Sequence, residues 1–141
     1  MPDAIRMRFD VDGDDFAGAG VASSEVKRAL KKLGMPPDLV KRTAICMYEG
    51  EINMVIHANG GVAMAAIRPD RVEIELCDRG PGIADVELAM QEGYSTASEQ
   101  ARNLGFGAGM GLPNMKRYAD EMTIDSRPGE GTTVRMVIRA R

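Results

Sequence analysis

The chain has no tryptophan, one histidine and two cysteines among its 141 residues, and aromatic residues make up 4% of it. Because there is one histidine and the cysteines show no ligand spacing, the sequence offers no zinc site. It also lacks an apolar run near the ~20 residues of a membrane-spanning helix, and its first residues form no apolar signal-peptide region. We therefore expect a cytoplasmic protein without membrane contacts, in which Cys46 and Cys77 stay reduced.

A large charge of one sign is also absent. Lysine and arginine total 18 against 21 aspartate and glutamate, so the net charge is -3, which provides no electrostatic footprint for nucleic acid. Hydrophobic residues make up 44% and charged residues 28%, the balance of an ordinary globular protein. The length predicts a single domain over residues 1–141, and we interpret the 11 methionines as filling of an adaptable core.

Hydrophobic periodicity predicts strands and helices that end at glycine or proline. We expect Ser23 or Ser24 to cap the first helix and Gly34 to end it. The predicted elements are a strand (5–11), two helices (25–33 and 36–58), two strands (62–68 and 72–77), a helix (112–121) and two strands (122–126 and 132–139). Strand pairs at both ends of this order predict an α/β (α+β) two-layer sandwich, with helices on one face of a mixed, mostly antiparallel sheet.

A glycine run precedes the last predicted helix. Gly105, Gly107, Gly109 and Gly111 alternate with other residues, so backbone N–H groups can converge on an anion at a helix N-terminus. A Walker A motif is excluded because the dipeptide Gly-Lys occurs nowhere in the chain. A Rossmann motif is excluded because the last glycine of that pattern is missing and no strand precedes the run. The run therefore predicts phosphate binding of another kind, against the alternative of a flexible surface loop.

Asp78 stands at the end of a predicted strand and is followed by Gly80 and Gly82. A carboxylate at a strand end can accept a hydrogen bond from a ligand, and an adenine amino group is one candidate. Ordinary turns use the same residue types, so this pattern alone leaves the turn as an open alternative. The stretch from 79 to 110 is unusually long for a loop, and long loops are commonly functional.

Glu49 and Asn53 interrupt the apolar pattern of the second helix and lie one turn apart on one face. A carboxylate can act as a general base, and an amide oxygen suits Mg²⁺, which prefers hard oxygen ligands. The alternative is an exposed stripe on which Glu49 pairs with a lysine or arginine. His57, one turn further, is interpreted as a structural histidine.

Together these motifs resemble those of the GHKL ATPases, the superfamily of gyrase, heat-shock chaperone, histidine-kinase and mismatch-repair ATPase domains. Residues 49–53 are similar to its E-x-x-x-N box and residues 78–82 to its D-x-G-x-G box. Residues 107–112 are similar to its second glycine box, and Gly131 with Thr132 to its terminal G-T element. The resemblance covers nearly the whole chain from about residue 22 and implies the GHKL (Bergerat) ATP-binding fold.

A closer resemblance is to the bacterial anti-sigma-factor and switch serine kinases of the RsbW and RsbT type. It is carried by residues 78–83, 89–96 and 111–113. The resemblance implies binding of ATP and Mg²⁺ and phosphorylation of a serine on a small STAS-type antagonist protein. Some members of that family also bind and hold a sigma factor.

The resemblance also implies roles for single residues. Glu49 is expected to be the base for the attacking hydroxyl, Asn53 to hold Mg²⁺, and Asp78 to contact the adenine amino group. Residues 83–110 are expected to form an ATP lid, in which Arg102 is the nearest candidate for the γ-phosphate. The other expected nucleotide-binding residues are Thr132, Gly80, Gly82, Gly105, Gly107, Gly109, Gly111 and Leu112.

Three functional readings follow from the sequence. The leading one is an ATP-dependent protein-serine kinase acting on a STAS-type partner. The alternative is an ATP-binding module that sequesters a sigma factor or another regulator with little or no transfer. The ATPase half of a histidine kinase is disfavoured because we expect no second domain with a phosphoacceptor. Whether the protein forms a homodimer stays open.

Overall fold

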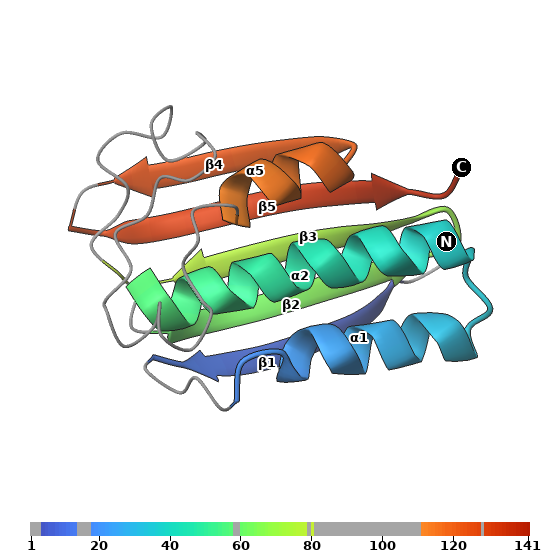
Figure 1. The fold of residues 1–141 in the computed structure, drawn as a ribbon, viewed down its shortest axis with the longest axis horizontal. Helices are drawn as coiled ribbons and strands as arrows, with labels where there is room; N and C mark the ends of the chain where they lie inside the picture. Colours follow the sequence, from blue (N-terminus) through green and yellow to red (C-terminus); the bar gives the residue numbers. More distant parts are fainter. Residues whose placement is uncertain (1–3, 14–17, 58–59, 79, 81–110, 128) are drawn as a thin grey trace.

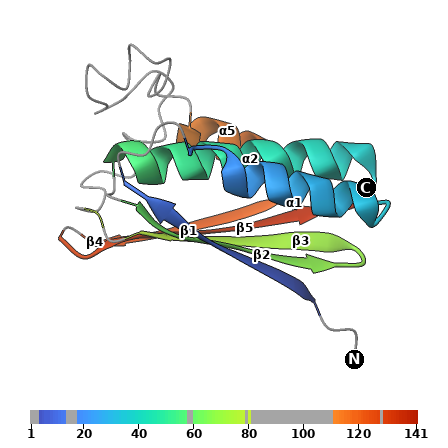
Figure 2. The same ribbon diagram turned by 90° about the horizontal axis from the view of Figure 1, so that it is seen from below.

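The computed structural model describes residues 4–13, 18–57, 60–78, 80, 111–127 and 129–141. One five-stranded sheet has the strand order β1-β2-β3-β5-β4. Three described helices cover one of its faces, and the opposite face carries none of them (Figures 1 and 2). The elements are β1 (Ile5–Asp12), α1 (Val21–Lys32), α2 (Pro37–His57), β2 (Gly60–Arg68), β3 (Arg71–Asp78), α5 (Gly111–Tyr118), β4 (Glu121–Arg127) and β5 (Gly131–Arg139).

The two-layer sandwich expected from the sequence is confirmed. All four described strand pairings are antiparallel, so this part of the chain contains none of the parallel pairs that a mixed sheet would include. The last helix ends at Tyr118, three residues earlier than predicted. The short helical pattern at 85–90 lies outside the described residues.

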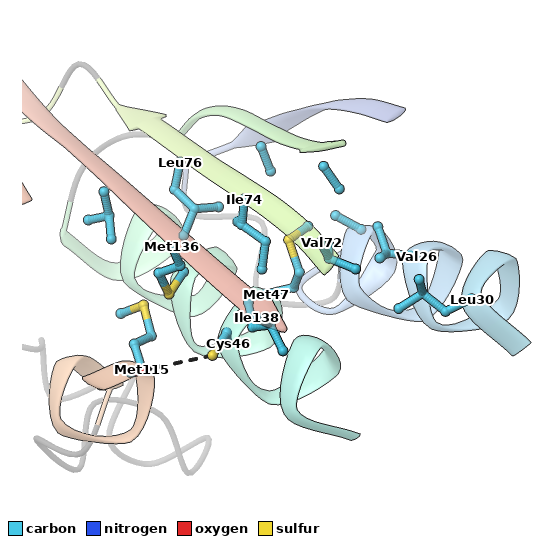
Figure 3. Close-up of a cluster of buried hydrophobic side chains, with 14 of the residues drawn as sticks. Val26, Leu30, Cys46, Met47, Val72, Ile74, Leu76, Met115, Met136 and Ile138 are labelled. Atoms are coloured by element: carbon cyan, nitrogen blue, oxygen red, sulfur yellow. Dashed lines mark hydrogen bonds between the residues drawn. The ribbon is translucent and has the colours of Figure 1, made fainter. Parts of the chain in front are cut away.

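The core lies between α2 and the sheet. Alternate residues of the central strands, such as Val72, Ile74 and Leu76 on β3, are buried toward the helices, as strand periodicity requires. Methionines fill much of the remaining space, and Figure 3 shows Met47, Met115 and Met136 among the packed side chains. None of the described helices is long and apolar enough to cross a membrane.

Gly50 brings α2 unusually close to the sheet. A Cβ on this residue would lie 2.0 Å from Cδ1 of Leu76, which is buried on β3. Glycine in a helix interior costs roughly 1 kcal/mol relative to alanine, so the close packing explains its presence in the middle of a 21-residue helix.

The start of α1 is capped differently from the sequence prediction, which was wrong. Gly20 occupies the N-cap position with φ 100°, and no side chain in the α1 sequence caps the helix. Instead Glu51 on α2 accepts backbone N–H bonds from Gly20 (3.0 Å), Ala22 (3.1 Å) and Ser23 (2.7 Å). The carboxylate is 2% exposed, so its negative charge is stabilised by these N–H groups and by the helix dipole.

The opposite end of α2 is tied to the C-terminal strand by Arg42, which is 4% exposed. Its guanidinium donates to Asp38 (2.7 Å), to Asp120 (3.1 Å) and to the carbonyl of Arg139 (2.6 Å). Asp120 also accepts from the Arg139 backbone (2.7 Å) and from Arg141 (3.0 Å). Each of the three guanidinium nitrogens of this buried cation thus donates to a carbonyl or carboxylate, which lowers the cost of burying it.

Candidate functional site

Four chain segments meet at one end of the sandwich. They are the C-terminal part of α2, the end of β3, and the starts of β5 and α5 (Figure 1). The surroundings of Gly61, at the start of β2, show how close α2 and β3 lie to each other. A Cβ on Gly61 would lie 2.7 Å from Cε of Met54 and 2.8 Å from Cα of Asp78. The helix turn that carries Asn53 therefore lies beside the strand end that carries Asp78.

Glu49 lies on the side of α2 that faces α5 and is partly buried. Burial is the larger influence on its pKa and raises it, while a hydrogen bond from the Asn114 amide lowers it, so that the net shift is upward. The amide nitrogen lies 3.4 Å from Oε2, and no hydrogen bond within the described parts of the chain reaches Oε1. A carboxylate with an available oxygen can act as a proton acceptor.

Asn53 follows Glu49 by one turn of α2, a rise of about 6 Å along the helix axis. Its side chain is partly exposed, and among the described residues it makes no hydrogen bond. The preceding residue, Ile52, and the following residue, Met54, are both buried. An unengaged amide at the edge of an apolar helix is suited to a metal ion or ligand, because its oxygen is a hard donor.

The Asp78 carboxylate is held by backbone groups on two sides. Its Oδ1 accepts the N–H of Gly80 and the N–H of Thr132, each at 3.0 Å. The described residues donate no hydrogen bond to Oδ2, so that oxygen is available to a ligand donor such as an exocyclic amino group. Thr132 is 7% exposed and its hydroxyl lies 2.8 Å from that of Ser126, so the support behind Asp78 is itself fixed.

Of the four glycines in the glycine run, Gly111 alone lies among the described residues. Gly111 begins α5, and the side chain of Leu112 is 8% exposed and belongs to the hydrophobic core. A contact of Leu112 with a nucleotide would therefore use its backbone. The remaining predicted residues and the predicted lid lie outside the described residues: Gly82, Gly105, Gly107, Gly109, Arg102 and the segment 83–110.

The structure thus brings Glu49, Asn53, Asp78, Gly80 and Thr132 to one end of the fold. Sequence reasoning missed one neighbour of this group, Asn114. Its signal in the sequence was weak. Asn114 is a polar residue between the apolar positions 112 and 115 of a predicted helix, and a solvent-exposed helix face explains such a residue equally well. No group of three or more histidine, cysteine, aspartate or glutamate side chains in the described regions could hold a metal ion.

Several known proteins are similar to this chain in sequence. The chain is 35% identical to the anti-sigma F factor of Bacillus velezensis over 144 residues, which cover 96% of this chain and 92% of that protein. It is 40% identical to the serine/threonine-protein kinase RsbT of Bacillus subtilis over 122 residues, 83% of this chain and 86% of the kinase. It matches the anti-sigma F factor of Caldanaerobacter subterraneus at 40% identity over 93 residues, spanning 62% of both chains.

A solved structure of the RsbU and RsbW domains of Rv1364c from Mycobacterium tuberculosis superposes with a TM-score of 0.65. The match covers 96% of this chain and 32% of that one, and at 17% identity it concerns the fold alone. The family model described as "histidine kinase-like ATPase domain" matches residues 15–138. These findings confirm the resemblance inferred from the motifs, and the chain belongs to the histidine kinase-like ATPase family.

Proposed function

We propose that this chain is a cytoplasmic ATP- and Mg²⁺-binding regulator that phosphorylates a serine on a STAS-type antagonist protein. The observation that carries the proposal is the shared position of Glu49, Asn53 and Asp78 at one end of the fold, in a member of an ATPase family. The 40% identity to a protein named as a serine/threonine-protein kinase supports the transfer activity.

The donor set fits ATP with Mg²⁺. Asn53 offers an amide oxygen without a hydrogen bond from the described residues, and Asp78 offers Oδ2 while Oδ1 is fixed by backbone N–H groups. Asn53 would hold the ion and Asp78 the adenine amino group. When bound, ATP would supply the phosphoryl group and Mg²⁺ would neutralise charge on it. The glycines at 105, 107 and 109 stay a prediction for the phosphates.

Glu49 would act as the general base. Its carboxylate is partly buried, and its Oε1 accepts no hydrogen bond from the described residues, so that oxygen can accept the proton of a hydroxyl. In transfer the serine O–H bond breaks, its proton moves to Glu49, the new O–P bond forms and the bond to the ADP leaving group breaks. Glu49 and Asn53 lie on one rigid helix turn, so base and metal ligand keep a constant separation.

A second candidate function is sequestration of a sigma factor by the ATP-bound protein with little transfer. Several relatives carry the name anti-sigma F factor, including one that matches over 96% of this chain. The chain spans 62% and 54% of the length of two of these curated relatives.

The decisive experiment incubates the protein with γ-labelled ATP, Mg²⁺ and a purified STAS-domain partner, alongside a calorimetric titration with ATP. Labelled serine on the partner supports the kinase. ATP binding without labelled serine contradicts the kinase and leaves sequestration, to be checked by co-purification with a sigma factor. If Asn53→Ala binds Mg·ATP as tightly as the unchanged protein, the site assignment itself is wrong.

A further inference from the structure

Asn114 makes the one hydrogen bond that the Glu49 carboxylate has among the described residues. The amide nitrogen of Asn114, on α5, donates to Oε2 of Glu49, on α2, across 3.4 Å. The two residues are 65 positions apart in the sequence, and both are partly buried. The contact therefore depends on how α5 is placed against α2.

That placement is fixed by the core. Leu112 and Met115 are three residues apart, so they project from one face of α5, and both are buried in the hydrophobic cluster. The Cys46 thiol, one turn before Glu49 on α2, donates to the carbonyl of Met115 at 3.8 Å (Figure 3). Two contacts one helical turn apart thus set the register of α5 against α2, and Asn114 reaches Glu49 as a consequence.

We propose that Asn114 is a positioning residue for Glu49. It holds Oε2 of the carboxylate and leaves Oε1 to accept the proton of the incoming serine hydroxyl. This inference rests on the proposed kinase function. The hydrogen bond also favours the ionised carboxylate, which is the form that a base needs.

The effect of the Asn114 hydrogen bond on the Glu49 pKa can be measured separately from other influences. Burial raises its pKa and the Asn114 bond lowers it, and these are the two influences on the carboxyl. Cys46 lies one turn before Glu49 on α2, and its pKa is raised to about 12, mainly by burial, so the thiol stays neutral through the working range. Lys116 and Arg117, the charged residues that follow on α5, are exposed. Loss of the amide donor should therefore raise the Glu49 pKa.

The first test is a double-mutant cycle with Glu49→Gln, Asn114→Ala and the double variant. We expect Asn114→Ala to lower the rate of serine phosphorylation about tenfold, the scale of one hydrogen bond to a charged group, with ATP affinity unchanged. In the Glu49→Gln background the same change should cost less than about twofold, because Asn114 acts through Glu49. Equal losses in both backgrounds would overturn the proposal, since a general packing defect affects both equally.

Two further variants separate hydrogen bonding from packing. Asn114→Asp keeps the shape of the side chain, removes the donor and places a like charge beside Glu49, so the loss should exceed that of Asn114→Ala. It also serves if Asn114→Ala fails to fold. Lys116→Ala, an exposed change on the same helix, is the control and should leave the rate within about twofold. A larger loss in the control than in Asn114→Ala contradicts a specific role for Asn114.

The second test does not depend on transfer. A carbon-13 NMR titration of the glutamate carboxyls, with the Glu49 signal assigned by its loss in Glu49→Gln, reads the pKa directly. We expect Asn114→Ala to raise the Glu49 pKa, because the variant removes the hydrogen bond that lowers it. An unchanged pKa overturns the positioning contact. If the pKa moves as expected while the unchanged protein phosphorylates no partner, the contact stands and the proposed function fails.

Discussion

Two glutamates two residues apart on α2 have opposite surroundings. Glu51 is 2% exposed and accepts three backbone N–H bonds at the start of α1. Glu49 is partly exposed and has one long bond, from the Asn114 side chain. Because successive helix residues project about 100° apart, a two-residue step sends the two carboxylates to opposite neighbours. Glu51 thus has its hydrogen-bonding capacity used in stabilising the fold, whereas Glu49 keeps one oxygen without a partner among the described residues.

The largest expected effect is the loss of serine phosphorylation when Glu49 is replaced. Glu49→Gln should lower serine phosphorylation by about 10²–10⁴-fold, the usual contribution of a general base, because an amide cannot accept the proton. Steady-state rates with a labelled partner measure the loss. ATP affinity and the unfolding midpoint should stay as they are, and a fall in both would place Glu49 with Glu51 as a structural carboxylate.

Replacing Glu51 should lower the stability of the fold. Glu51→Ala leaves three backbone N–H groups at the α1 start without an acceptor, so we expect the free energy of unfolding to fall by about 3 kcal/mol. Urea denaturation measures it, and Glu51→Gln, which keeps one oxygen acceptor, should lose less. Glu49→Ala is the matched control and should cost under about 1 kcal/mol. Similar losses for the two alanine variants would remove the distinction between the carboxylates.

Gly50, which separates the two glutamates, allows a test through packing. Gly50→Ala places a Cβ 2.0 Å from Cδ1 of buried Leu76, and we expect a loss of about 2 kcal/mol from overpacking. Thermal unfolding measures it. Adding Leu76→Val removes a clashing branch and should restore part of the stability, since neighbouring changes are not additive. If Gly50→Ala instead stabilises the protein through helix propensity, α2 does not need its close approach to β3.

The smallest effect concerns a third carboxylate, Asp120, whose partners are arginines. Burial raises its pKa, but hydrogen bonds from the Arg139 backbone, Arg141 and Arg42 outweigh it and lower the pKa to about 2. Since the pKa is lower in the folded state than in the unfolded one, the stabilisation is present above about pH 4 and is lost as the pH falls toward 2. After solvent screening we expect about 1 kcal/mol. Asp120→Asn should flatten this part of the stability curve in acid titrations followed by circular dichroism.

The elements that depend on local sequence were predicted well. The alternation over 5–11 predicted β1, and helical spacing from Pro36 predicted α2 nearly to its end at His57. The cap of α1 was not predictable in this way. Its acceptor, Glu51, lies about 30 residues further along the chain, so no local rule could prefer it over Ser23.

The residues of the candidate site likewise divide into those that local spacing predicts and one that it does not. Glu49 and Asn53 could be found because their spacing is one helix turn, and Asp78 because it ends a strand before a glycine turn. Asn114 could not, because its contact with Glu49 spans 65 residues and exists only when Leu112 and Met115 set the position of α5. Contacts between elements need the register of packing, which periodicity does not contain.

The exposed thiol of Cys77 makes the natural protein ready for optical experiments. Thiol-directed dyes react with the thiolate, so the buried Cys46, with its pKa of about 12, should stay unlabelled while Cys77 reacts. Successive strand residues point to opposite faces, so a dye on Cys77 sits outside the sheet while Asp78, its neighbour, faces the helices. A single fluorophore can then follow nucleotide association in real time without any engineered cysteine.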